Sequence, residues 1–211
     1  MTGYRFDEAE FRVLAGKSLL GASPTVFGRG DNDLNPGLKL MPVDAPRRDA
    51  AVLVPVVLRE PELTVILTQR TDHLPNHAGQ ISFPGGKLDP VDRDTVDAAL
   101  REAEEETALS REFVEPLGFL DGYLTRTGFH IVPVVALVRP GFTLVPAAGE
   151  VAAVFEVPLR FLMTVENHAR HSIEWKGAAR HFYAMPYEDR YIWGATAGML
   201  RNLYDRMYAM P

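Results

Sequence analysis

The chain contains no cysteine among its 211 residues. Disulfides, thiolate zinc sites and cysteine nucleophiles are therefore excluded. Long apolar runs are also absent: the longest lie near residues 50–58 and 131–138, well short of the roughly 20 residues that cross a bilayer. Charges interrupt the first ten residues, so no signal peptide is expected. Together these absences predict a cytoplasmic protein that does not bind a membrane.

Positive charge is scarce. The 22 lysines and arginines are outnumbered by 28 aspartates and glutamates, which gives a formal net charge of −6. This balance argues against a nucleic-acid-binding protein, because such proteins neutralise phosphates with clustered basic residues. If the substrate is an anion, cations must be concentrated locally to offset the field of the whole chain. The motifs of serine hydrolases, P-loop NTPases and dinucleotide-binding folds are absent as well.

The first 48 residues are expected to form a helix at 6–20 and then an extended segment rich in glycine, proline and asparagine. That segment contains Arg29-Gly30-Asp31, a tripeptide known from cell adhesion. Three residues match easily by chance, so we interpret it as loop chemistry. Residues 49–211 would then hold the core of the protein, and no linker divides the chain into two domains.

Apolar runs and turn residues predict the remaining elements. Strands are expected at 51–58, 63–70, 80–83, 119–124, 131–138 and 151–157, a polar hairpin at 171–175 and 181–185, and helices at 94–108, 158–164 and 193–208. Because strands and helices interleave along one chain, we expect an α/β (α+β) fold with a mixed central sheet between helices, in a single domain spanning 1–211.

The helix expected at 94–108 concentrates negative charge in "REAEEE", residues 101–106. Asp94 is a plausible N-cap. A narrow apolar stripe is expected to face the core and consists of Val96, Leu100, Ala103 and Thr107. Glu102, Glu105 and Glu106 converge beside that stripe, whereas Glu104 lies on the other flank. Two interpretations stay open: a solvated acidic face, or a site for a hard cation such as magnesium, which prefers carboxylate oxygens.

Phe83-Pro84-Gly85-Gly86 lies between the expected strand at 80–83 and this helix. Adjacent glycines allow the main chain to approach a ligand closely, although an ordinary tight turn explains them equally well in isolation. The combination of this turn with three glutamates on the following helix is much rarer than either feature alone. It favours the cation site over the solvated face.

Residues Gly85–Leu109 resemble the Nudix box, the signature of hydrolases that split diphosphates linked to another moiety. The residues that match its core pattern are Arg101, Glu102, Ala103, Glu105, Glu106 and Leu109. The sequence departs from the pattern at three points. Asp92 stands where the first glutamate is expected, one extra residue precedes Arg101, and Ala108 replaces a glycine.

The preceding segment, residues 67–86, resembles the stretch found upstream of the box in Nudix enzymes that hydrolyse coenzyme A. Its matching residues are Leu67, Thr68, Arg70, Gly79, Phe83, Pro84, Gly85 and Gly86, while Pro75 occupies the place of a second arginine. Residues 127–135, 150–159 and 192–200 also resemble that branch. The resemblance therefore covers most of the chain after about residue 50.

The resemblance implies a Nudix-type α/β/α sandwich and a cofactor of Mg²⁺ or Mn²⁺. It implies that Glu102 and Glu106 bind the metal, that Glu105 is a third ligand or assists the attacking water, and that the Gly85 carbonyl completes the shell. Arg101 would orient a glutamate. The general base is Glu102, Glu105 or Glu150. The candidate substrate contacts are Arg70, His77 and Gly79, with a surface ion pair as the alternative role of Arg70.

Three functions remain open at this point. The leading hypothesis is metal-dependent hydrolysis of the diphosphate bond of coenzyme A or its derivatives, which would give 3′,5′-ADP and 4′-phosphopantetheine. The second is a Nudix hydrolase of another nucleoside diphosphate derivative, such as ADP-ribose or a dinucleotide. The third is a non-catalytic nucleotide-binding Nudix domain. In each case the partner is a small molecule and not a nucleic acid, and a homodimer is left open.

Overall fold

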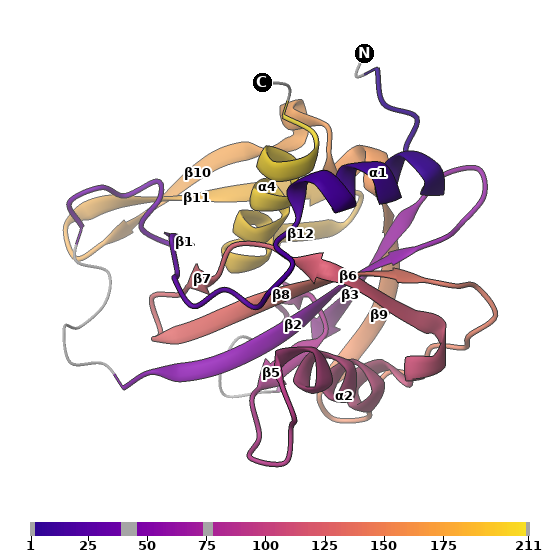
Figure 1. Ribbon diagram of the computed structural model, residues 1–211. Coiled ribbons are helices and arrows are strands. Elements are labelled where there is room, and N and C mark those ends of the chain that lie inside the picture. Colours follow the sequence, from indigo (N-terminus) through magenta and orange to yellow (C-terminus); the bar gives the residue numbers. More distant parts are fainter. Residues whose placement is uncertain (1–2, 39–45, 74–77, 210–211) are drawn as a thin grey trace.

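The computed structural model describes residues 3–38, 46–73 and 78–209. A nine-stranded mixed sheet runs through the middle of the molecule, with helices on both faces (Figure 1). Its strands are β1 Arg29–Gly30, β2 Arg48–Val57, β3 Thr64–Arg70, β4 Ile81–Ser82, β5 Gly85–Lys87, β6 Val114–Phe119, β7 Tyr123–Leu124, β8 Phe129–Val138 and β9 Val151–Pro158. This arrangement confirms the expected α/β fold with a mixed central sheet.

The centre of the sheet is the parallel pair β2 and β8, which register along their full length from Arg48 opposite Phe129 to Val57 opposite Val138. Eight consecutive residues of β2, from 50 to 57, are buried or nearly so. Such a continuous apolar run is typical of a strand that is covered on both faces. The strand order from one edge is β1-β7-β8-β2-β3-β4, while β5 pairs with β2, β6 with β8 and β9 with β3.

Two apolar cores lie on opposite faces of the sheet. Alternate residues of β2 divide between them: Val52, Val54 and Val56 join one core, and Ala51 and Leu53 join the other. The first core is covered by α1 Glu8–Ser18 and α4 Ala195–Met207, and the second by α2 Thr95–Thr107 (Figure 1).

A second, three-stranded antiparallel sheet is formed by β10 Ala169–Trp175, β11 Ala178–Tyr187 and β12 Arg190–Trp193. Along the chain, β9 and β10 are connected by the short helix α3 Leu159–Leu162 and the single 3₁₀ turn η2 Val165–Asn167. Another 3₁₀ turn, η1 Arg111–Phe113, follows α2. The expected hairpin at 171–175 and 181–185 is confirmed and extended. In the described ranges, no helix is both long and apolar enough to cross a bilayer.

Three expected boundaries were wrong. The strand predicted at 119–124 is interrupted: β6 ends at Phe119, β7 begins at Tyr123, and both pair with β8. Asp121 lies in the interruption, where its carboxylate accepts hydrogen bonds from Arg206 at 2.6 and 2.7 Å. The last helix begins at Ala195 and not at 193, because Gly194 has φ of +66° and separates it from β12. Gly85-Gly86 belongs to strand β5 and is not a turn.

Helix α4 packs against the N-terminal segment at β1 and against β7. Arg29 forms ion pairs with Asp33 at 2.8 Å and with Asp205 of α4 at 2.9 Å. Gly198 of α4 lies directly against Tyr123: a Cβ atom at this position would sit 2.5 Å from the Tyr123 hydroxyl oxygen. The close approach of α4 to β7 therefore depends on a residue without a side chain.

We expect Gly198→Ala to lower the free energy of unfolding by about 1–3 kcal/mol, because the added methyl group overpacks the contact with Tyr123. Gly16→Ala is the matched control, since Gly16 is also helical but nothing lies within 4 Å of its added Cβ. There the gain in helix propensity should stabilise by about 0.5–1 kcal/mol. Denaturant unfolding of both variants measures the difference, and equal effects would contradict the overpacking argument.

Candidate functional site

Helix α2 is set by local sequence signals at both ends. The Asp94 side chain caps it by accepting from the Asp97 amide at 2.8 Å, and Ala108 ends it in the left-handed conformation with φ of 58°. Of the expected core stripe, Ala103 and Thr107 are buried, and Val96 and Leu100 are partly buried and pack against the second core. Ala98 and Ala99, which lie outside that stripe, are fully buried as well.

The fully buried apolar residues on the face of α2 that meets the sheet are its smallest side chains: Ala98, Ala99 and Ala103. Small residues let the helix backbone approach the strands closely, and the turn of the helix then brings Glu102 and Glu106 against β5. This packing explains why two glutamates of the acidic stretch leave bulk water.

Glu106 is the most buried of the candidate residues, with only 6% of its surface exposed. Its pKa is raised to about 7, chiefly by burial and also by the charges of Glu102 and Glu150. The Gly85 amide, which donates to its carboxylate at 3.2 Å, and the Arg70 charge act in the opposite direction and lower the pKa. The nearest cation is the Arg70 guanidinium, whose Nη1 lies 4.0 Å from Glu106 Oε1. The carboxylate is therefore desolvated without a close ionic partner in the described part of the chain.

Glu102 lies one turn before Glu106 and is half-buried. Burial raises the pKa of Glu102, whereas a hydrogen bond from Arg101 lowers it. Its carboxyl group packs on Gly86: a Cβ atom there would lie 2.4 Å from Glu102 Cδ. Glycine at position 86 is thus required for this carboxylate to reach the strand.

Arg101 holds the acidic residues around it in place. It donates to Glu102 at 3.0 Å and to Glu105 at 3.1 Å. Its other nitrogens bind Asp92 at 2.8 and 2.9 Å and the Lys87 carbonyl at 3.2 Å. Asp92 has 3% of its side chain exposed and its pKa is lowered, chiefly by this arginine. Asp92 therefore anchors Arg101, and Arg101 in turn fixes Glu102 and Glu105.

Glu105 and Glu150 remain open to solvent. The Glu105 side chain is 59% exposed and points to Arg101, while Glu150 lies in the turn before β9. The Ala147 amide of that turn donates to the Glu106 carbonyl at 2.9 Å, which keeps the Glu150 segment beside α2. Both glutamates are thus near the buried pair and accessible to water.

A divalent cation fits the buried pair Glu102 and Glu106 better than it fits a set of three side chains. In residues 3–38, 46–73 and 78–209, no three acidic or histidine side chains converge closely enough to form a complete metal site. Glu102 and Glu106 offer two carboxylates beside the main chain of Gly85, and the repulsion between them raises the Glu106 pKa. Magnesium is commonly held by one or two carboxylates together with substrate phosphates. The donor set therefore suits such a cation.

A cleft of about 430 Å³ opens on the sheet side of the glutamates. It reaches Arg70, Gly85 and Gly86, each of which contacts Glu102 or Glu106. Its apolar lining includes Val52, Phe83, Phe129, Ile131, Trp193 and Met199, and its cations are Arg70, Lys87, Arg126 and Arg180. The acidic chain thus concentrates positive charge where an anion would bind.

The three expected substrate contacts have different outcomes. Arg70 lines the cleft, and its buried Nε has no hydrogen-bond partner among the described residues. Gly79 has φ of +66° and packs against Asp72. It does not itself line the cleft, whereas its neighbour Gln80 does. His77 lies outside the described residues.

Sequence reasoning missed two arginines of the cleft, Arg126 and Arg180. Only Arg126 had a feature in the sequence that could have identified it, namely its position beside the matching stretch that starts at Thr127.

The raised pKa of Glu106 predicts a pH-dependent stability in metal-free protein. Between the ordinary pKa near 4.5 and about 7, folded protein binds a proton that unfolded protein releases, so stability falls as pH rises. Glu106→Gln removes this loss, and we expect the variant to be more stable than the wild type by about 3 kcal/mol above pH 7. Adding magnesium should stabilise only the wild type. Thermal unfolding across pH with and without magnesium measures both effects; parallel pH profiles would contradict the prediction.

Comparison with known proteins agrees with this geometry. Residues 47–178 match the model of the NUDIX domain. The chain is 42% identical over 163 residues to the uncharacterized Nudix hydrolase NudL of Yersinia pestis (strain Pestoides F), which covers 77% of this chain and 81% of that protein. It has the same identity and coverage with NudL of Yersinia pseudotuberculosis serotype O:1b (strain IP 31758).

Among solved structures, the Nudix hydrolase RenU from M. smegmatis superimposes with a TM-score of 0.50 at 16% identity, covering 78% of this chain and 88% of that one. This likeness concerns the fold. The extent of the family match and the identity to the curated relatives together show that the chain belongs to the Nudix hydrolase family.

Proposed function

We propose that this Nudix hydrolase cleaves the diphosphate bond of coenzyme A or its derivatives and releases 3′,5′-ADP and 4′-phosphopantetheine. One observation carries the proposal. The segment at 67–86 that resembles the coenzyme A branch contributes Arg70, Phe83, Gly85 and Gly86 to the cleft, directly beside Glu102 and Glu106. The part of the sequence that suggests the substrate therefore lies where the substrate would bind.

The shape and polarity of the cleft support a substrate of this kind. Its apolar wall, which includes Phe83, Ile131 and Trp193, suits the non-phosphate parts of a large nucleotide derivative. Its arginines suit phosphate oxygens, because a guanidinium offers paired donors. Arg70 is the proposed diphosphate contact, since its unpartnered Nε gains an acceptor when an anion enters.

Nudix hydrolases generally use divalent metal ions. We propose that Glu102, Glu106 and the Gly85 carbonyl hold Mg²⁺ or Mn²⁺, which when bound offsets the charge of the diphosphate and acidifies a water molecule. Arg101 keeps Glu102 and Glu105 in position through its hydrogen bonds to both. Glu105 and Glu150 are exposed to solvent, so either is placed to accept a proton from the attacking water.

We further propose that the whole chain, 1–211, works as one domain. Asp31 from the N-terminal segment and Trp193 from the C-terminal part both line the cleft, although they lie outside the range that matches the NUDIX domain. Removal of either flank would leave the cleft open on that side.

A substrate panel tests the proposed reaction. With magnesium or manganese present, coenzyme A should be cleaved with a higher kcat/KM than ADP-ribose or diadenosine compounds, and mass spectrometry should identify 3′,5′-ADP and 4′-phosphopantetheine. Faster cleavage of ADP-ribose would overturn coenzyme A as the substrate and leave another nucleoside diphosphate derivative in its place.

We expect Glu106→Gln to lower kcat at least about a hundredfold, because the loss of one carboxylate from the buried pair removes several kcal/mol of transition-state stabilisation. Glu104→Gln is the matched control: Glu104 lies on the same helix but is exposed and pairs with Arg111 at 3.5 Å. That variant should retain nearly full turnover. Unchanged turnover of Glu106→Gln at saturating magnesium would refute the assigned role.

A further inference from the structure

Arg180 of β11 is a buried cation with unused hydrogen-bonding capacity. Only 8% of its surface is exposed, yet it lines the cleft. Its one ion pair is a long contact of 3.4 Å from Nη2 to Asp31 Oδ2, and its Nε has no partner among the described residues. Because a guanidinium carries five N–H donors, and buried donors without acceptors are costly, Arg180 is left with donors that an incoming anion could satisfy.

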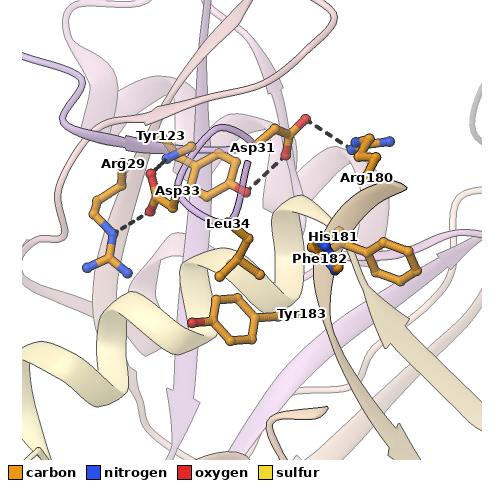
Figure 2. A pocket seen from close by; sticks show the side chains of 12 residues that line it. Arg29, Asp31, Asp33, Leu34, Tyr123, Arg180, His181, Phe182 and Tyr183 are labelled. Carbon is orange, nitrogen blue, oxygen red and sulfur yellow. Dashed lines mark hydrogen bonds and ion pairs between the residues drawn. The ribbon is translucent and has the colours of Figure 1, made fainter. Parts of the chain in front are cut away.

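Asp31 joins this arginine to a second one. One Asp31 oxygen faces Arg180, and the other accepts the Tyr123 hydroxyl at 3.0 Å (Figure 2). The oxygen that faces Arg180 also accepts the main-chain amide of Arg126 at 2.9 Å. Arg126 also lines the cleft, and its guanidinium makes no ion pair within the described part of the chain. Arg126 and Arg180 thus bring two positive charges to the cleft beside the single negative charge of Asp31, which leaves a net positive charge at this end of the cleft.

The network is held rigidly by the neighbouring residues. Asn35, which is 3% exposed, donates to the Asp31 carbonyl at 2.7 Å and to the His181 carbonyl at 2.8 Å, and it accepts from the His181 amide at 2.7 Å. These bonds fasten the loop that follows β1 to β11 immediately beside Arg180. A preorganised cation loses little entropy when it binds, which favours recognition of an anion.

This cationic end is separate from the glutamate end of the cleft. Arg70 contacts Glu106, whereas the Arg180 side chain and the Arg126 main-chain amide contact Asp31. The diphosphate belongs with the glutamates, so the second group of cations calls for a second anionic group on the substrate.

We propose that Arg126 and Arg180 form a second anion subsite of the cleft, which binds a phosphomonoester of the substrate. Its identification with the 3′-phosphate of coenzyme A rests on the proposed function. The subsite makes Arg126 and Arg180 determinants of specificity: they favour a nucleotide with a phosphate on its ribose over the same nucleotide without it.

Product binding tests the subsite without requiring turnover. Isothermal titration calorimetry at constant salt, with magnesium present, compares the Kd values of 3′,5′-ADP and 5′-AMP. The wild type should bind 3′,5′-ADP at least about tenfold more tightly, because charge-assisted hydrogen bonds are worth roughly 1.5–3 kcal/mol. Arg126→Gln and Arg180→Gln should each reduce that preference severalfold or more.

Arg170→Gln is the matched control, since it removes the same charge from an exposed position on the neighbouring strand β10 and should keep the preference. Equal Kd values in the wild type, or a preference that survives in both cleft variants, would overturn the subsite. If circular dichroism shows that Arg180→Gln is unfolded, the result for Arg126→Gln decides.

The same proteins separate the subsite from the proposed reaction. Cleavage of coenzyme A without any preference for 3′,5′-ADP would keep the reaction and overturn the subsite. A clear preference for 3′,5′-ADP without cleavage of coenzyme A would keep the subsite and overturn the reaction.

Discussion

The close contact between helix α2 and strand β5 is the constraint on which the candidate site depends. Ala98, Ala99 and Ala103 let the helix lie close to the sheet, and Gly86 on the strand leaves room for the Glu102 carboxyl group. Glu102 and Glu106 are consequently pressed against the strand and removed from water, which raises the pKa of both. Desolvated carboxylates attract cations strongly, because the surrounding medium screens little. The affinity of these two glutamates for a cation thus depends on packing as much as on their charge.

Two ion-pair networks keep the walls of the cleft in position. Asp92 and Arg101 connect the loop before α2 to the glutamates of the helix. Asp31 connects the N-terminal segment to the β7–β8 loop and to β11. In both networks one charged side chain binds groups from several segments of the chain. The positions of the charges therefore depend on the positions of those backbone segments. An acidic chain can in this way present arginines to an anion without being basic overall.

The features that the sequence predicted correctly are governed by nearby residues. Asp94 and the spacing of the glutamates determine where α2 begins and which side chains share a face, and both signals lie within one helix. The strand predicted at 51–58 likewise follows from its own apolar run, which forms most of β2. Errors arose where distant residues decide. Gly85–Lys87 became a strand because Ala50–Val52 offers backbone partners, and the buried face of α2 is wider than the predicted stripe because Ala98 and Ala99 also pack on the sheet.

Arg180 could not be found from the sequence for the same reason. Its partner Asp31 is 149 positions away, and only the folded chain brings the two together. The same separation explains why a tripeptide at 29–31 that looked like ordinary loop chemistry contributes to a wall of the cleft. Burial, unsatisfied donors and shared partners identify such residues, and none of these properties is visible in a linear string.

The separation of Asp31 and Arg180 along the sequence also determines the order in which the parts of the cleft are synthesised. A ribosome makes the chain from its N-terminus, so β2, β5 and the acidic helix emerge well before β11 and α4. A nascent chain at that stage has its glutamates but still lacks Arg180, Trp193 and Met199, which close the opposite side of the cleft. The binding surface is therefore finished only after β11, β12 and the first turns of α4 have been made, and a chain that stops before them carries the family signature without a complete place for a ligand.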